Sequence, residues 1–130
     1  MTNTELKSIN TTALAFMGDA VYEVYVRKYV MEKGVVSADT LHKIAVKYVR
    51  ADGQAESVKA MMNGFLTEEE TALVKRARNR KSTSKSRSAG PVAYKLATAF
   101  EALIGYLYLS DNQERAQEIM KRAVEIIEEE

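Results

Sequence analysis

The chain has 130 residues, of which 46% are apolar and 28% charged, with 19 Lys and Arg against 18 Asp and Glu, no Cys and one His. This length suits a single domain over residues 1–130, and the composition excludes a wholly disordered chain, a uniformly basic nucleic-acid coat, thiolate metal sites and zinc sites built from several histidines. Because no apolar run is long enough to cross a bilayer and the first ten residues do not resemble a signal peptide, we expect a cytoplasmic protein with no membrane partner.

The first predicted helix spans residues 12–33. One proline and six glycines in the whole chain favour an all-helical fold. Asn10 or Thr11 can cap this helix and Gly34 can stop it. One stripe at helical spacing consists of Leu14, Met17, Val21, Val24 and Tyr25. Other apolar residues lie off that stripe, and a helix that is apolar nearly all round lies either in the middle of a structure or at a subunit interface.

The middle of the chain predicts three further helices. Two of them lie between residues 40 and 64 and are separated at Gly53. Thr67 and Glu70 have the spacing of a capping box, which begins the third and carries it to about residue 80.

A Ser-rich, basic stretch, KSTSKSRSAG, then covers residues 81–90, and we expect it to be a mobile loop. Pro91 suits the first turn of the next helix, which runs to about residue 109. Asp111 and Glu114 repeat the capping-box spacing at the start of the last helix.

Two acids lie inside apolar helical segments. Asp19 belongs to LAFMGDAVYEVYV, and Glu101 belongs to YKLATAFEALIGYLYL. Burying an ionised carboxylate is costly unless it is paired or bound to a metal, although each acid could instead face water. Gly18 precedes Asp19 and Gly105 follows Glu101 by one turn, and such small residues allow another backbone or a ligand to come close.

A divalent cation offers a functional explanation for both acids. Mg²⁺ prefers oxygen ligands and keeps several waters, so one or two carboxylates per ion suffice. Such an ion activates water and neutralises the charge that develops on a phosphodiester. We therefore expect Asp19 and Glu101 to be catalytic residues that bind Mg²⁺. Glu23, one turn after Asp19, either supports them or lies at the surface.

A basic strip covers residues 75–87, with seven cations and no acid. The rest of the chain holds 12 basic and 18 acidic residues, so the nearly neutral total hides a strong asymmetry. The strip has no aromatic residue, which favours phosphate contacts along duplex RNA over base stacking; the alternatives are a solvated loop and an acidic protein partner. The candidate RNA-binding residues are Lys75, Arg76, Arg78, Arg80, Lys81, Lys85 and Arg87.

Several segments resemble the ribonuclease III family. LAFMGDAVYEVYV resembles its signature segment, and TAFEALIGYLYL resembles its second acidic motif. The short chain and the segment LHKIAVKYVRADGQ are similar to Mini-ribonuclease III, which has no double-stranded-RNA-binding domain. The resemblance covers nearly the whole chain. It implies an all-helical ribonuclease III-like domain, active as a homodimer, that cleaves both strands of duplex RNA with Mg²⁺ and leaves 5′-phosphate ends.

The usual substrate of Mini-ribonuclease III, in the bacteria that possess it, is the precursor of large-subunit (23S) ribosomal RNA, so the resemblance implies this substrate. A ribosomal protein is a candidate for presenting that RNA to the enzyme. The resemblance also makes Asp19 and Glu101 the metal-ligating acids. The broader family has two further acids, where this chain has Ala15 and Thr98.

Thr98 is therefore expected either to hold a water or Glu101 in the site, or to bond the carbonyl one turn before it. The two missing acids leave open a non-catalytic helical RNA-binding protein, or a dimeric adaptor in ribosome assembly. Either alternative tolerates neutral replacements at Asp19 and Glu101, whereas a nuclease does not.

Overall fold

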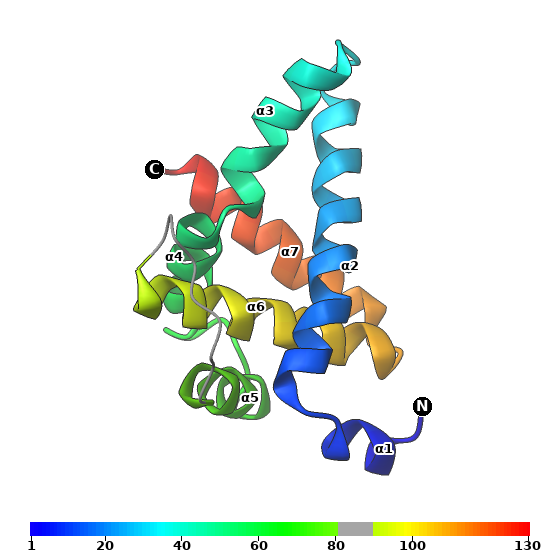
Figure 1. Ribbon diagram of the computed structural model, residues 1–130, viewed down its shortest axis with the longest axis vertical. Coiled ribbons are helices and arrows are strands. Elements are labelled where there is room, and N and C mark those ends of the chain that lie inside the picture. The colour runs from blue at the N-terminus through cyan, green and yellow to red at the C-terminus, as the bar shows by residue number, and fades with distance from the viewer. Residues whose placement is uncertain (81–89) are drawn as a thin grey trace.

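The computed structural model describes residues 1–80 and 90–130, and every regular element in them is an α-helix, which confirms the all-helical prediction (Figure 1). The helices are α1 (Asn3–Ser8), α2 (Thr11–Glu32), α3 (Ala38–Val49), α4 (Ala51–Met61), α5 (Glu68–Asn79), α6 (Pro91–Leu109) and α7 (Gln113–Glu128). Within this described part, none of the helices combines the length and the apolar character that a bilayer span requires.

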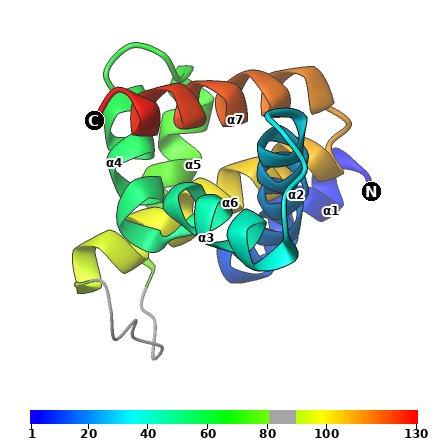
Figure 2. The same ribbon diagram turned by 90° about the horizontal axis from the view of Figure 1, so that it is seen from above.

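Helix α6 is the central element of the fold. It packs against α2, α4, α5 and α7, and the two views show α2 crossing it while α7 covers another side (Figure 1 and Figure 2). Its side chains are buried on nearly all sides, which explains why its sequence is apolar around the whole helix. The buried residues are Leu96, Ala97, Ala99, Phe100, Ala102, Leu103, Ile104, Gly105 and Leu107.

The backbones of α2 and α6 touch where the two helices cross. A Cβ atom at Gly18 would overlap the carbonyl oxygen of Glu101, and a Cβ atom at Gly105 would overlap the carbonyl oxygen of Leu14. Only glycine fits at both positions, so the expected close approach of another backbone beside each acid is confirmed. This crossing places the segment that carries Asp19 against the segment that carries Glu101.

The face that α2 buries differs from the predicted apolar stripe. Val24, a member of that stripe, is 69% exposed. Spacing alone could not select the buried face because α2 is apolar nearly all round, and the contact of Gly18 with α6 decides it. The buried residues of α2 are Thr11, Leu14, Ala15, Gly18, Tyr22, Val26 and Val30.

Several predicted helix ends are confirmed. The side chain of Asn10 accepts a hydrogen bond from the backbone N–H of Ala13 at 2.8 Å at the start of α2. Thr67 and Glu70 form the reciprocal capping box of α5, and Pro91 is the first residue of α6. These ends were predictable because each depends on contacts within a few residues.

Two predicted helix boundaries were wrong. The break between α3 and α4 falls at Arg50, whose backbone is extended, and Gly53 lies inside α4, where neighbouring backbone comes close. At the start of α7, the preceding residue is Asn112 and Asp111 has a left-handed φ of 61°. Since a capping residue needs an extended backbone, the capping box expected between Asp111 and Glu114 does not form.

Candidate active site

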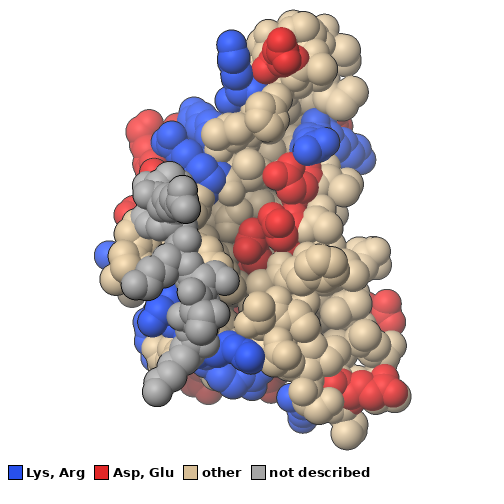
Figure 3. Space-filling model, viewed as in Figure 1, with Lys and Arg blue, Asp and Glu red and all other residues tan. Residues whose placement is uncertain are grey.

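Asp19 and Glu101 meet beside the crossing of α2 and α6. Asp19 is exposed, whereas Glu101 is half-buried, and the two carboxyl groups are near enough for Asp19 to perturb the ionisation of Glu101. Figure 3 shows acidic side chains gathered in the hollow beside the middle of α2. The structure therefore brings together two acids that lie 82 positions apart in the sequence.

The carboxyl group of Glu101 has a strongly raised pKa. Burial, together with the neighbouring carboxylate of Asp19, raises the pKa to about 8, while the hydrogen bond from Gln54 opposes the shift. Two carboxylates that share one site cannot both ionise easily, so Glu101 keeps a proton at neutral pH when no cation is bound. A cation that binds between the two acids would take the place of that proton.

Gln54 of α4 is a third side chain at this pair, and the sequence analysis did not single it out. Gln54 is only 2% exposed. Its Nε2 donates to the carbonyl of Val49 at 2.8 Å and lies 3.5 Å from Oε2 of Glu101. Its Oε1 is buried and has no hydrogen-bond partner among the described residues. The one signal in the sequence is a polar residue at the end of LHKIAVKYVRADGQ.

The side chains of Glu23 and Thr98 each bond to a partner other than Asp19 or Glu101. Glu23 forms an ion pair with Arg27 at 3.1 Å, although its charge still contributes to the raised pKa of Glu101. The hydroxyl of Thr98 donates to the carbonyl of Tyr94, one turn before it, at 2.9 Å. Thr98 therefore makes the local helix bond rather than a bond to Glu101.

The donor set at this site suits a hard cation that keeps much of its own water. Among residues 1–80 and 90–130, no three or more His, Asp and Glu side chains are grouped closely enough to hold a metal. Asp19 and Glu101 supply carboxylate oxygens, the ligands that Mg²⁺ prefers, and Mg²⁺ usually takes only one or two of them from a protein. The exposed Asp19, the half-buried Glu101 and the buried oxygen of Gln54, which has no partner among the described residues, are thus compatible with Mg²⁺.

The described part of the basic strip lies at the end of α5, where Figure 3 shows basic side chains. Arg76 and Arg80 line a shallow groove together with Lys7 of α1, which the sequence analysis missed because it lies far away in the chain. Lys75 lines a different groove, and Arg78 donates to Oδ1 of Asn79 at 3.2 Å. Lys81, Lys85 and Arg87, with the rest of the predicted mobile loop except Gly90, lie outside the described residues.

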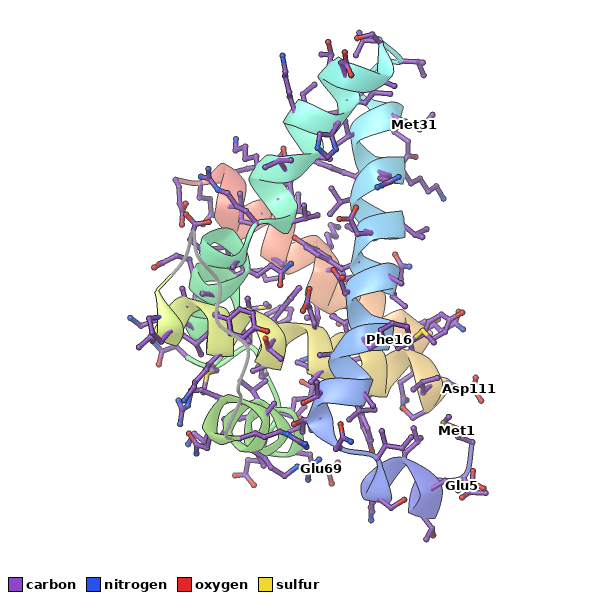
Figure 4. The ribbon with its side chains drawn as sticks, viewed as in Figure 1. Met1, Glu5, Phe16, Met31, Glu69 and Asp111 are labelled. Atoms are coloured by element: carbon purple, nitrogen blue, oxygen red, sulfur yellow. The ribbon has the colours of Figure 1, made fainter. Side chains whose placement is uncertain are left out.

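An apolar surface lies along the outer side of α2. Phe16 is 82% exposed and Val24 is 69% exposed, and Phe16 and Met31 both stand outside the bundle in Figure 4. A neighbouring groove runs between α2 and α7 and is lined by Val21, Tyr25 and Met120, among others. Large apolar side chains rarely cluster at such exposure unless another surface covers them.

Comparisons with known proteins find the same family over most of the chain. A family model described as "Ribonuclease III domain" matches residues 12–112. Mini-ribonuclease 3 of Brevibacillus brevis is 49% identical over 119 residues, covering 92% of this chain and 88% of that protein. Mini-ribonuclease 3 of Clostridium tetani is 40% identical over 129 residues, covering 98% and 85%. A Fusobacterium nucleatum protein of known crystal structure is 35% identical in sequence to this chain. The two structures superpose with a TM-score of 0.82, covering 93% of this chain and 96% of that one.

Proposed function

The chain belongs to the Mini-ribonuclease 3 branch of the ribonuclease III family, and we propose that its endoribonuclease activity resides in the Asp19–Glu101 pair and uses Mg²⁺ to cleave double-stranded RNA. The observation that carries this proposal is the meeting of the two acids at the glycine crossing of α2 and α6. The half-buried carboxyl group of Glu101 would not stay ionised beside the carboxylate of Asp19 without a compensating cation, and otherwise keeps a proton.

The side chains have separate tasks in this reaction. Bound Mg²⁺ supplies activation of water and neutralisation of the charge that develops on the phosphodiester. Asp19 and Glu101 would hold the ion, and Glu101 would give up its proton to do so. The described residues offer no other side chain at the pair that is placed as a general base. Glu23 lies at the edge of the pair and adds negative charge there.

The direct test uses long duplex RNA with the purified chain. We expect internal cuts with 5′-phosphate ends in the presence of Mg²⁺ and none with EDTA, while single-stranded RNA and duplex DNA stay intact. Because a cation is needed for chemistry and not for phosphate contacts, EDTA should leave RNA binding in place. Binding without cleavage under all metal conditions would instead support the non-catalytic RNA-binding alternative.

The basic strip and Lys7 are proposed to contact the RNA backbone. We expect the double substitution Arg76→Gln and Arg80→Gln to lower the slope of log affinity against log salt concentration by about 2, since each phosphate contact contributes roughly 0.9. Filter binding between about 50 and 200 mM salt measures the slope. Lys121 is an exposed cation of α7, so Lys121→Gln is the control and should leave the slope unchanged. An unchanged slope in the double variant would remove α5 from the RNA-binding surface.

The apolar outer side of α2 is proposed to be covered by a second copy of the chain. In a symmetric dimer each contact occurs twice, so Phe16 would be buried in both copies. Burying one phenylalanine side chain contributes about 2 kcal/mol. The exposure of Phe16 and Val24 supports this proposal, because both would cost free energy if they faced water in the working enzyme.

Phe16→Ser is the variant that tests this dimer. We expect it to weaken dimerisation about a thousandfold, from two lost contacts of about 2 kcal/mol each, with little loss of stability because Phe16 is 82% exposed in the single chain. Sedimentation equilibrium of the wild type and the variant measures the effect. A wild-type chain that stays monomeric at micromolar concentration would contradict the homodimer.

The biological substrate is proposed to be the precursor of large-subunit ribosomal RNA, cleaved in the cytoplasm and presented by a ribosomal protein. This part of the proposal depends on the resemblance to Mini-ribonuclease III alone. Cleavage of a duplex made from the paired ends of that precursor, compared with an unrelated duplex of equal length, tests it. Equal rates on both duplexes, with and without ribosomal proteins, would contradict selective recognition.

A further inference from the structure

Gln54 carries an energetic penalty that the fold alone does not require. Within the part of the chain that the structure describes, its Oε1 is buried without a hydrogen-bond partner, which lowers the stability of the fold. An apolar side chain of similar size would avoid this cost at a position that is 2% exposed. The amide nitrogen of the same side chain must therefore offset the penalty.

That nitrogen joins two different parts of the molecule. Its hydrogen bond to the carbonyl of Val49, at 2.8 Å, satisfies the last residue of α3, whose carbonyl has no partner within its own helix. Its second N–H lies on the side of Glu101, with 3.5 Å between Nε2 and Oε2. The Val49 bond also fixes which end of the amide is the nitrogen, because the reverse orientation would set two oxygens against each other.

We propose that Gln54 is a positioning residue that holds the carboxylate of Glu101 in the orientation needed to share a divalent cation with Asp19. The inference rests on the proposed function, since it needs Glu101 to be an ion ligand. Gln54 extends from α4, so it ties Glu101 to a third helix besides the α2–α6 crossing. Because the described residues hold no group of three or more ligating side chains, a rotated Glu101 would leave Asp19 as the ion's one proposed carboxylate ligand.

Gln54→Met tests the proposal, with Ser57→Ala as its matched control. Ser57 lies on the same helix, is fully buried, and donates to the carbonyls of Gly53 at 2.8 Å and Ala123 at 3.2 Å, so its loss also removes a buried hydrogen bond of α4. Neither hydrogen bond involves Asp19 or Glu101. Gln54→Leu repeats the test if the methionine variant does not fold.

Two readouts separate positioning from simple destabilisation. One is the Mg²⁺ concentration that gives half-maximal cleavage, and the other is the rise in melting temperature that Mg²⁺ causes in the RNA-free protein. We expect Gln54→Met to raise the half-maximal concentration about tenfold, because partners of metal ligands typically contribute 10- to 100-fold to affinity. It should also reduce the Mg²⁺-dependent rise in melting temperature, while affinity for RNA in EDTA stays within about twofold of wild type. Ser57→Ala should lower the melting temperature without changing either Mg²⁺ response.

The outcomes distinguish this inference from the proposed function. If Gln54→Met responds to Mg²⁺ like the wild type while Asp19→Asn and Glu101→Gln lose the response, the role of Gln54 is overturned and the active site stands. A shift of equal size in Ser57→Ala would also overturn it, because a weakened α4 would then be sufficient. A wild-type protein without any response to Mg²⁺ would overturn both.

Discussion

Asp19→Asn and Glu101→Gln are each expected to slow cleavage of duplex RNA about a thousandfold while leaving affinity for the RNA within about twofold. Each substitution removes one of the two carboxylates proposed to hold the ion, and among the described residues no group of three or more ligating side chains could replace it. A bound cation contributes several kcal/mol to the transition state, and about 4 kcal/mol corresponds to a factor of a thousand. Single-turnover cleavage in saturating Mg²⁺ and a binding assay in EDTA measure the two effects separately.

Glu118→Gln is the matched control for these two variants. It makes the same acid-to-amide change on α7, where the exposed Glu118 forms an ion pair with Arg115 at 3.2 Å. We expect its cleavage rate to stay within about twofold of wild type. Undiminished cleavage by either Asp19→Asn or Glu101→Gln would refute the assignment of the active site. A loss of RNA binding that parallels the loss of cleavage would show that the acids serve folding rather than chemistry.

Gly18→Ala and Gly105→Ala are each expected to destabilise the fold by about 3 kcal/mol or more, which lowers the melting temperature by roughly 10 °C. A methyl group at either position would overlap backbone of the opposite helix, and backbone cannot swing aside as a side chain can. The two helices must then separate, which also moves Asp19 away from Glu101. Thermal and urea unfolding measure the loss of stability.

Gly53→Ala provides the comparison for this pair. All three glycines lie inside helices, where alanine alone would gain up to about 1 kcal/mol of helix propensity. At Gly53, however, the nearest atom to a new Cβ is the carbonyl oxygen of Lys47, at 3.3 Å. We therefore expect a change within about 1 kcal/mol in either direction. Equal stability changes at Gly18, Gly105 and Gly53 would contradict the close crossing of α2 and α6.

The parts of the fold that depend on local chemistry were predictable. Asn10, Thr67 and Pro91 mark helix ends through contacts within one turn, so the sequence shows them directly. Helix α1 was missed although Thr2 and Glu5 form a capping box at its start, because six residues are too few for a periodic apolar pattern. The break at Arg50 has no glycine or proline to mark it, so the extended backbone of that residue could not be predicted from the sequence.

Of the residues at the candidate site, only the two acids could be predicted from the sequence. Asp19 and Glu101 are conspicuous because charge is rare in such apolar helices, and the glycine beside each indicated a close contact. The contributions of Gln54 and Lys7 depend on which helices become neighbours in space. The spacing of apolar residues along the chain does not predict those neighbours. The buried face of α2 could not be predicted for the same reason, since a helix that is apolar nearly all round has no preferred side until its partner is known.

The account depends most directly on Asp19 and Glu101 sharing one divalent cation. Calorimetry of Mg²⁺ binding to the RNA-free protein at pH 7, repeated in buffers of different ionisation enthalpy, tests this sharing. Because the pKa of Glu101 is raised to about 8, its proton must leave when the ion binds. We predict the release of about one proton per ion in the wild type and none in Glu101→Gln, together with much weaker binding in that variant. Binding of Mg²⁺ without proton release, or with equal strength in Glu101→Gln, would contradict the shared site.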